Sequence, residues 1–295
     1  MRGLGLRLDV IYPADTPHTA LLSADGRTVR LTSRADAPTM SAELAPFTPE
    51  FQLTRAADLA TPGRAGMYYR DLIPGRLGGR YIASHITINE GGPVADWVHY
   101  HHVAWQMIFV RAGWVRVVYE GQGDPFVMHS GDLVLQPPEI RHRVLESSAG
   151  LEVIEIGCPA LHETLADHDL DLPDLSAGVE REFSGQRFLR HVTKDCPWIA
   201  VGEMDVQETA MAEATGGLAT VRIVRPGNGN SMKIAPHDGE LVFGFVLEGS
   251  ALLDYHAGAA LAGGDAFVIP PLEPWAISAA SEDFRLLHVT SGHVR

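Results

Sequence analysis

Hydrophobic residues along this chain occur in short runs rich in β-branched and aromatic side chains. Gly, Pro, Asp and Ser separate these runs. Such runs between turn-forming residues are typical of β-strands. They predict strands at Trp114–Tyr119, Phe126–Met128, Leu133–Leu135 and Leu151–Ile156. Many short strands at this spacing indicate an all-β sandwich or barrel.

The pattern also repeats. Gly91–Gly113 aligns with Gly227–Gly249, and the pairs Gly131-Asp132 and Pro137-Pro138 recur as Gly264-Asp265 and Pro270-Pro271. Self-similarity of this length indicates a duplicated unit. We therefore expect two copies of one β-domain, at residues 66–158 and 201–295.

Two segments lie outside the repeat. Residues 1–65 form an N-terminal arm with a possible hairpin, Thr19–Ser23 and Thr28–Thr32, around a turn at Asp25-Gly26. Such an arm is expected to cover the other barrel or an edge strand. Residues 159–200 are expected to be a packed connector with short helical turns.

The first copy holds a metal-site pattern. His99 and His101 are two residues apart, so on a strand their side chains point to the same face. His102 then points the opposite way, to the outside of the barrel or to a contact between protomers. Gln106 offers an amide oxygen, and His142 joins from a distant segment. Imidazole nitrogen suits iron, zinc, copper and nickel.

These residues resemble the cupin superfamily, whose two motifs read about G-x5-H-x-H-x4-E-x6-G and G-x5-P-x-G-x2-H. The chain has GGPVADWVHYHHVAWQMIFVRAG and GDLVLQPPEIRH in their places. All three histidine positions are kept, but Gln106 stands where many cupins have a metal-binding Glu. Pro93 stands where the first motif begins with Gly, and Glu139 where the second has Gly.

The resemblance implies two tandem jelly-roll (double-stranded β-helix) barrels. It implies one divalent transition metal per chain, held by His99, His101, Gln106 and His142, with iron ranked before zinc, nickel and manganese. Paired cupin barrels often form dimers, so a homodimer is expected.

The second copy has lost the ligand pattern. Its corresponding positions are Ala235, His237, Val242 and Trp275. One imidazole among such neighbours cannot hold a catalytic metal, so we expect this barrel to be metal-free and structural. The alternative is that its interior binds a ligand, with Trp275 as a stacking surface.

Other residues near the first site are candidates for substrate contact. Strand parity places Trp97 and Ile108 at an apolar pocket, and Arg141 next to His142 is a candidate for fixing a substrate carboxylate. His85 and Glu146 are candidates for proton transfer. The alternatives are a satisfied core histidine for His85 and solvent-exposed positions for Arg141 and Glu146.

Composition narrows the partners. The formal net charge of −14 disfavours nucleic acid and anionic membranes, because no surplus of basic residues exists to neutralise phosphates. No apolar run is long enough to span a membrane, and no secretory signal is evident. Cys158 and Cys196 are the only cysteines, so a reducing, cytoplasmic location is expected rather than a disulfide framework, with a Cys158–Cys196 bridge as the alternative.

The predicted site indicates a metal-dependent enzyme with a small organic substrate. An apolar pocket favours an aromatic or diketone-like compound and a dioxygenase. A neutral Gln106 ligand favours Lewis-acid chemistry instead, as in isomerase or lyase cupins that linearise unsaturated uronates. A third hypothesis is a metal-bearing or small-molecule-binding protein without turnover.

Overall fold

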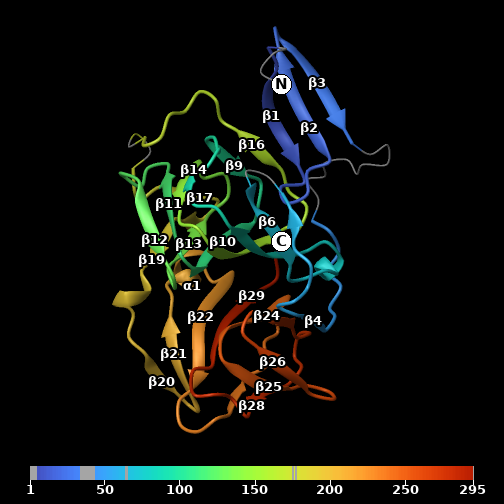
Figure 1. Ribbon diagram of the computed structural model, residues 1–295, viewed down its shortest axis with the longest axis vertical. Coiled ribbons are helices and arrows are strands. Elements are labelled where there is room, and N and C mark those ends of the chain that lie inside the picture. Colours follow the sequence, from blue (N-terminus) through green and yellow to red (C-terminus); the bar gives the residue numbers. More distant parts are fainter. Residues whose placement is uncertain (1–4, 34–43, 64–65, 175, 177, 295) are drawn as a thin grey trace.

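Two antiparallel β-barrels pack against each other in the computed structural model, one formed largely by the first repeat and one by the second (Figure 1). The structure describes residues 5–33, 44–63, 66–174, 176 and 178–294. The all-β, two-barrel fold predicted from the sequence is confirmed.

The first barrel consists of two facing sheets. Its outer sheet has the order β12-β11-β14-β9-β16-β1-β2-β3, with β8 also paired to β14. These strands are β1 (Arg7–Tyr12), β2 (Thr19–Ala24), β3 (Arg27–Thr32), β8 (Gly92–Pro93), β9 (His99–His101), β11 (Trp114–Tyr119), β12 (Phe126–His129), β14 (His142–Ser147) and β16 (Thr164–Ala166).

The inner sheet of the first barrel lies nearer the second barrel and has the order β19-β13-β10-β15-β7-β6-β5. Its strands are β5 (Thr61–Pro62), β6 (Tyr68–Asp71), β7 (Ile82–Ile88), β10 (Trp105–Ala112), β13 (Leu133–Gln136), β15 (Leu151–Cys158) and β19 (Leu189–His191). The predicted strands at 114–119, 126–128, 133–135 and 151–156 all lie in this barrel.

The second barrel repeats this arrangement. Its inner sheet has the order β20-β21-β22-β29-β24-β27-β4 and its outer sheet β23-β28-β25-β26. The strands are β4 (Gln52–Thr54), β20 (Ile199–Val201), β21 (Met204–Glu208), β22 (Ala219–Pro226), β23 (Met232–Ile234), β24 (Leu241–Glu248), β25 (Ser250–Asp254), β26 (Ala259–Ala262), β27 (Ala266–Val268), β28 (Trp275–Ser278) and β29 (Arg285–Ser291). The order β27-β24-β29-β22 matches β13-β10-β15-β7, as duplication predicts.

Turns at equivalent places use glycine for the same reason. Gly113 follows β10 with a φ of 78°, and Gly249 follows β24 with a φ of 75°. Gly131 and Gly264 both have a φ of 92°. Residues with a Cβ reach these left-handed conformations only with strain, which explains why the repeat keeps glycine at these positions.

The N-terminal arm contains the hairpin expected from the sequence, with Asp25 and Gly26 at positive φ between β2 and β3. Figure 1 shows β1, β2 and β3 extending beyond the first barrel. The arm then crosses to the second barrel, where β4 pairs with β27. The expectation that the arm covers the other barrel is met by this strand, which protects an otherwise open sheet edge.

The connector differs from expectation. The predicted helical turns are limited among its described residues to one 3-10 turn, Thr193–Asp195 (η3). Instead, β16 pairs with β9 and β1, β19 pairs with β13, and β17 (Glu182–Phe183) pairs with β18 (Gln186–Arg187). The open edges of the first barrel explain this, because they offer hydrogen-bond partners that a helix would leave unpaired. The other described helices are the 3-10 helix Arg76–Gly78 (η2) and α1 (Met211–Ala214).

A hydrophobic core joins the two barrels. It combines side chains of the first inner sheet, such as Trp105 and Phe109, with side chains of the second, such as Phe243 and Phe245. All four are at most 2% exposed. The second barrel therefore buries the inner sheet of the first, as expected for a stabilising partner.

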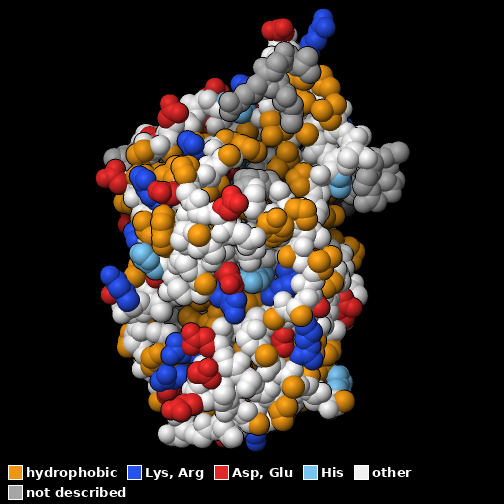
Figure 2. Space-filling model, viewed as in Figure 1, with side chains coloured by type: hydrophobic (Ala, Val, Ile, Leu, Met, Phe, Trp, Pro, Cys, Tyr) orange, Lys and Arg blue, Asp and Glu red, His pale blue; other side chains and the backbone are white. Residues whose placement is uncertain are grey.

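The surface and the cysteines add three observations. The face shown in Figure 2 carries acidic and basic side chains interspersed across both barrels. Cys158 and Cys196 are both free thiols, so the alternative of a bridge between them is excluded. Among the helices formed by the described residues, none has the length and apolar character needed to cross a membrane. The homodimer stays a prediction.

Candidate metal centre and its cavity

Three histidines converge inside the first barrel. His99 and His101 lie on β9, and His142 begins β14, directly opposite His99 across the antiparallel pair. Each histidine offers one ring nitrogen as a ligand atom, and these three nitrogens all lie within 4.8 Å of one another. The residues are 1%, 7% and 4% exposed, respectively. The structure thus brings together the histidines that the sequence pattern predicts, with two from one strand and one from its neighbour.

Backbone carbonyls orient all three imidazoles. Nδ1 of His99 is 2.7 Å from the carbonyl oxygen of Trp97, and Nδ1 of His142 is 3.0 Å from that of Ile140. Nδ1 of His101 is 3.3 Å from the carbonyl oxygen of Glu163. A carbonyl oxygen only accepts, so in each neutral ring the hydrogen lies on Nδ1 and Nε2 carries the lone pair. This is the usual way in which proteins prepare histidine for metal binding.

A carboxylate lies behind one of these rings. Oδ1 of Asp96 is 3.5 Å from Nδ1 of His99, and its Oδ2 accepts a hydrogen bond from the backbone N–H of Val144. The Asp96 side chain is only 3% exposed. A buried carboxylate near the outer nitrogen of a ligating histidine increases the basicity of the ligand.

Gln106 is buried on β10, facing the same barrel interior from the inner sheet. Its amide nitrogen donates a hydrogen bond to Oε1 of Glu155. Its amide oxygen is buried without a hydrogen-bond partner among the described residues. Three imidazoles prepared in this way fit a divalent transition metal. Gln106 as a fourth ligand stays a prediction, supported by its orphaned amide oxygen.

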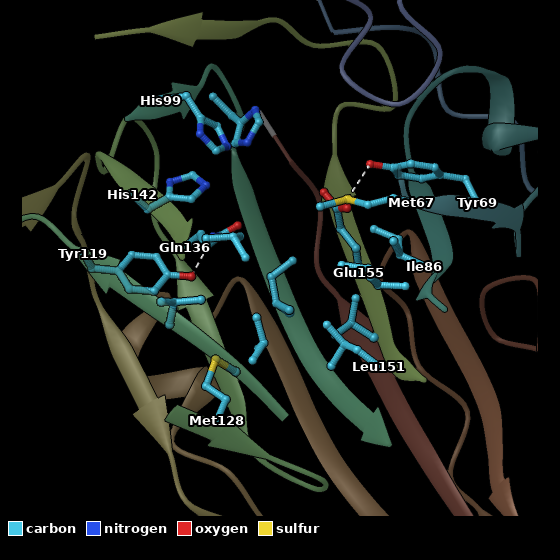
Figure 3. A pocket seen from close by; sticks show the side chains of 17 residues that line it. Met67, Tyr69, Ile86, His99, Tyr119, Met128, Gln136, His142, Leu151 and Glu155 are labelled. Atoms are coloured by element: carbon cyan, nitrogen blue, oxygen red, sulfur yellow. Dashed lines mark hydrogen bonds between the residues drawn. The ribbon is translucent and has the colours of Figure 1, made fainter. Parts of the chain in front are cut away.

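A cavity of about 90 Å³ opens at the histidines (Figure 3). Its walls are mainly apolar. The apolar members of the lining are Met67, Ile86, Ile88, Ile108, Val115, Val117, Met128, Val144, Leu151 and Val153. Its polar members, besides the histidines, are Tyr69, Tyr119, Gln136 and Glu155. Among the described residues that line it, none is Lys or Arg.

Tyr119 and Gln136 form a polar pair on the cavity wall. The Gln136 amide nitrogen donates to the Tyr119 hydroxyl oxygen at 2.8 Å, and the Tyr119 ring stacks on His142 with 5.4 Å between ring centres. Burial raises the pKa of Tyr119 far above its usual value, against the opposing effect of the Gln136 hydrogen bond. The hydroxyl is therefore neutral and keeps a proton to donate into the cavity.

The turn before His142 explains one departure from the motif. Glu139 occupies the position where the cupin motif has glycine, and its φ is 63°. Leu272 has the same φ in the corresponding turn of the second barrel. Both copies thus keep the left-handed turn without glycine, at a cost in backbone strain.

Of the predicted substrate-contact residues, the structure places Ile108 in the cavity lining. Trp97 precedes β9 and instead offers its carbonyl to His99, with 6.5 Å between the two ring centres. Strand parity fails for Trp97 because the strand begins only at His99. Arg141 points away from the cavity, where it pairs with Asp167 at 3.1 Å and lies over the ring of Tyr100.

Glu146, predicted as a candidate base, also lies outside the cavity. Val144 lines the cavity, but the pairing register between β11 and β14 shifts after it, so Glu146 lies opposite Arg116. The nearest charged atoms of Glu146 and Arg116 are 3.9 Å apart, and both side chains are more than 40% exposed. A bulge reverses the inside–outside alternation along β14, which explains why Glu146 was wrongly assigned to the cavity.

His85, the second candidate for proton transfer, faces the other barrel. Its neighbours Ile86 and Ile88 line the cavity, so alternation along β7 turns His85 to the opposite side of the sheet. Its Nε2 is 2.9 Å from Oε2 of Glu152, and its Nδ1 is 3.1 Å from Nη2 of Arg70. Arginine only donates, so Nδ1 accepts and Nε2 donates to Glu152. His85 is thus a satisfied buried histidine between the barrels. This matches the alternative given for it above, and not the predicted role in proton transfer.

Glu152 gives this inter-barrel cluster a pH dependence. The hydrogen bond from His85, reinforced by Arg111 and opposed by burial, lowers the pKa of Glu152 from 4.5 to about 2. A carboxyl with a lowered folded-state pKa contributes stability above its unfolded pKa, and this contribution is lost as the pH falls toward the folded value. The cluster should therefore weaken between about pH 4.5 and pH 2.

We expect Glu152→Gln to lower the free energy of unfolding by roughly 1–3 kcal/mol at neutral pH. The difference from the unmodified protein should shrink as the pH approaches 3. Urea denaturation across this range measures it. Glu182→Gln is the control, because its ion pair with Arg187 is more than half exposed on both sides. A difference that stays constant with pH would contradict the assignment.

Two residues near the site were missed by sequence reasoning. Glu155 lies within a largely apolar strand and lines the cavity. His162 is 3% exposed, with a ring centre 5.4 Å from that of His101, and its Nδ1 is bonded to the carbonyl oxygen of Pro159. Burial lowers the pKa of His162, so its ring is neutral. The sequence did contain a signal for Glu155, because this residue lies at two-residue intervals from Leu151 and Val153 on one predicted strand. It contains no comparable signal for His162.

The positions in the second barrel that correspond to the metal ligands carry no such arrangement. Val242 and Trp275 are 3% and 4% exposed and pack in the core, with Trp275 edge-on to Phe267. Ala235 is exposed, and Nδ1 of His237 accepts a hydrogen bond from the backbone N–H of Gly239. Apolar packing in place of ligands supports the prediction of a structural second barrel.

The fold and site therefore define a double-barrel β protein with a three-histidine candidate metal centre in its first barrel. Comparison with protein families identifies the class further, because residues 84–157 match the model of the cupin domain. The first barrel is a cupin domain, and the whole chain has the two-barrel cupin fold. No curated protein matches the chain in sequence.

Several solved structures share the complete fold. An oxalate decarboxylase of Lactobacillus farciminis in complex with formate has 16% sequence identity and a TM-score of 0.59, with 88% of each chain covered. A salicylate 1,2-dioxygenase from Pseudaminobacter salicylatoxidans has 17% identity and a TM-score of 0.59, covering 85% of this chain and 87% of that one. Protein Ylba from E. coli has 12% identity and a TM-score of 0.61, covering 86% and 97%. At these identities the likeness shows the fold.

Proposed function

We propose that this protein is a mononuclear metal-dependent dioxygenase that cleaves a small aromatic or diketone-like substrate with dioxygen. The observation that supports it best is the three-histidine group at one end of a cavity whose walls are mainly apolar. Few, well-placed polar groups within an apolar cavity are typical of sites for small organic ligands.

In this proposal, residues of the first barrel hold the metal and shape the substrate cavity. His99, His101 and His142 present Nε2 lone pairs fixed by backbone hydrogen bonds, so little reorganisation is needed on metal binding. A divalent metal at these nitrogens supplies Lewis acidity and, if it is iron, electrons for reaction with dioxygen. The neutral hydroxyl of Tyr119 is placed to donate to a substrate oxygen. The apolar walls exclude water from a reactive substrate.

The cavity also favours one substrate class over others. Oxalate, salicylate and uronates each carry at least one carboxylate, and no Lys or Arg lies in the described lining to receive it. Aromatic or diketone compounds without a carboxylate match the apolar walls better. A non-oxidative reaction is the second candidate, because Glu155 places a carboxylate within reach of the cavity for proton transfer.

The test is the metal content of anaerobically purified protein, combined with oxygen uptake in the presence of aromatic and diketone compounds. We expect about one iron per chain, because the site offers one set of imidazoles, and oxygen uptake that depends on substrate. A protein that contains zinc, nickel or manganese and consumes no oxygen but converts the substrate would favour the isomerase or lyase alternative. Bound metal without turnover would favour a binding protein, and His142→Ala is the metal-free control.

A further inference from the structure

The two facing sheets of the first barrel contribute different chemistry to the cavity. All three histidines come from the outer sheet, on β9 and β14. Glu155 comes from β15 of the inner sheet, where it lies between Ile108 on β10 and Ser84 on β7. Figure 3 shows Glu155 across the cavity from His99 and His142. A carboxylate and a metal centre thus face each other over the space available to a substrate.

The direction of Glu155 follows from its strand. Leu151 and Val153 precede it at two-residue intervals, and all three side chains line the cavity. Side chains at such intervals point to the same face of a strand. The intervening Glu152 points to the other face and joins the inter-barrel cluster. One strand therefore uses two glutamates for separate purposes.

The surroundings of Glu155 make its charge important. Among the described residues, the cavity lining contains no Lys or Arg and consists mainly of apolar side chains. A second, smaller cavity that Glu155 also lines adds Asp15, His101 and His162. A partner for the carboxylate is the side-chain amide of Gln106, which is neutral. Charges interact more strongly in such a poorly solvated environment than in water. The wall opposite the metal centre is therefore selective for the charge of whatever lies against it.

We propose that Glu155 determines substrate specificity. It accepts a hydrogen bond from a neutral, proton-donating substrate such as a phenol or the enol of a 1,3-diketone, and it repels a substrate carboxylate. The substrate's O–H stays the donor and no bond is broken in this step. This inference rests on the proposed function, because it concerns the same cavity and names its substrate class.

A positioning role for Glu155 makes a different prediction. Its hydrogen bond holds the Gln106 amide with the nitrogen toward Glu155, which leaves the orphaned Gln106 oxygen for a metal. If Glu155 acted only in this way, its replacement would weaken metal binding and leave substrate preference unchanged. Metal affinity and ligand preference must therefore be measured on the same variants.

The experiment compares two ligands of similar shape, 2,4-pentanedione and acetoacetate, in which a methyl ketone is replaced by a carboxylate. Their Kd values are measured by calorimetry on protein loaded with Zn(II), which needs no turnover. The variants are Glu155→Gln, which removes the charge, and Glu155→Asp, which keeps it. Glu146→Gln is the matched control outside the cavity. Metal content is determined before and after each titration.

We expect Glu155→Gln to lower the Kd for acetoacetate relative to the Kd for 2,4-pentanedione by at least about tenfold, since a like-charge contact is removed. The ratios for Glu155→Asp and Glu146→Gln should stay near that of the unmodified protein, and zinc should be retained in all. An unchanged ratio in Glu155→Gln, with or without loss of zinc, would overturn the proposal. So would failure of the unmodified protein to bind either ligand.

Failure of the proposed function gives a distinguishable result. If the iron-loaded protein consumes no oxygen but the ratio still shifts, the specificity role stands and the dioxygenase proposal fails. If oxygen is consumed but the ratio does not shift, the specificity role alone is wrong.

Discussion

Replacing His101 with alanine is expected to abolish activity and to weaken metal binding by more than about 100-fold, because even the partners that merely orient ligands are worth 10- to 100-fold. Two imidazoles remain, and neither can substitute for the missing one, since each is tied to the backbone carbonyl of the residue two positions before it. The barrels should keep their fold, because His101 lines the cavity and is absent from the hydrophobic core between the barrels.

The neighbouring histidine provides a matched control. His102 is half-exposed, points out of the barrel and pairs with Glu163 at 2.8 Å. His102→Ala removes the same chemical group one residue away and should leave metal content and activity close to those of the unmodified protein. Metal analysis by mass spectrometry, together with circular dichroism, tests both variants. Full metal content in His101→Ala, or loss of metal in His102→Ala, would show that the face of β9 is assigned incorrectly.

This pair of histidines also shows what could be predicted from the sequence. Alternation within a regular strand is a local property, so His99 and His101 were assigned to the interior and His102 to the exterior correctly. The barrels followed from the repeat and from glycines that the turns need at positive φ, such as Gly113 and Gly249. Both kinds of signal are contained within a few neighbouring residues.

Assignments failed where the outcome depended on a partner strand. Glu146 follows a shift in register that only the pairing of β14 with β11 defines. His85 lies on the correct strand, but whether a sheet face meets the cavity or the second barrel depends on how the barrels pack. Glu155 was overlooked because an acidic residue within an apolar run has a clear meaning only when the opposite wall is known.

The inter-barrel contact that we expect to be most sensitive to mutation is an ion pair between Arg80 and Glu240. Two hydrogen bonds of 2.8 Å join the guanidinium to the carboxylate. The side chains are 11% and 5% exposed. The Tyr81 hydroxyl also donates to Glu240, at 3.2 Å. The pair therefore joins the first barrel to the second next to their shared core.

We expect Arg80→Met to lower the free energy of unfolding by about 3–5 kcal/mol, the usual cost of leaving one member of a buried pair without its partner. Part of this loss comes from the hydrogen bonds that Arg80 donates to the carbonyls of Ala45 and Val294. The double variant Arg80→Met/Glu240→Gln removes the unpaired charge as well and should be more stable than Arg80→Met alone. Urea denaturation of both single variants and the double variant separates the two contributions.

The pH dependence identifies which charge is responsible. Burial raises the pKa of Glu240, but the hydrogen bonds and positive charge of Arg80 outweigh burial and hold this pKa below its usual range. The stability from the pair is present above the unfolded pKa and is lost as the pH falls through the folded one. Without Arg80, burial alone should raise the pKa of Glu240, so the variant should protonate earlier and its deficit should narrow in mild acid. A deficit that is independent of pH, and that persists in the double variant, would mean that the carbonyl hydrogen bonds of Arg80, rather than its charge, join the two barrels.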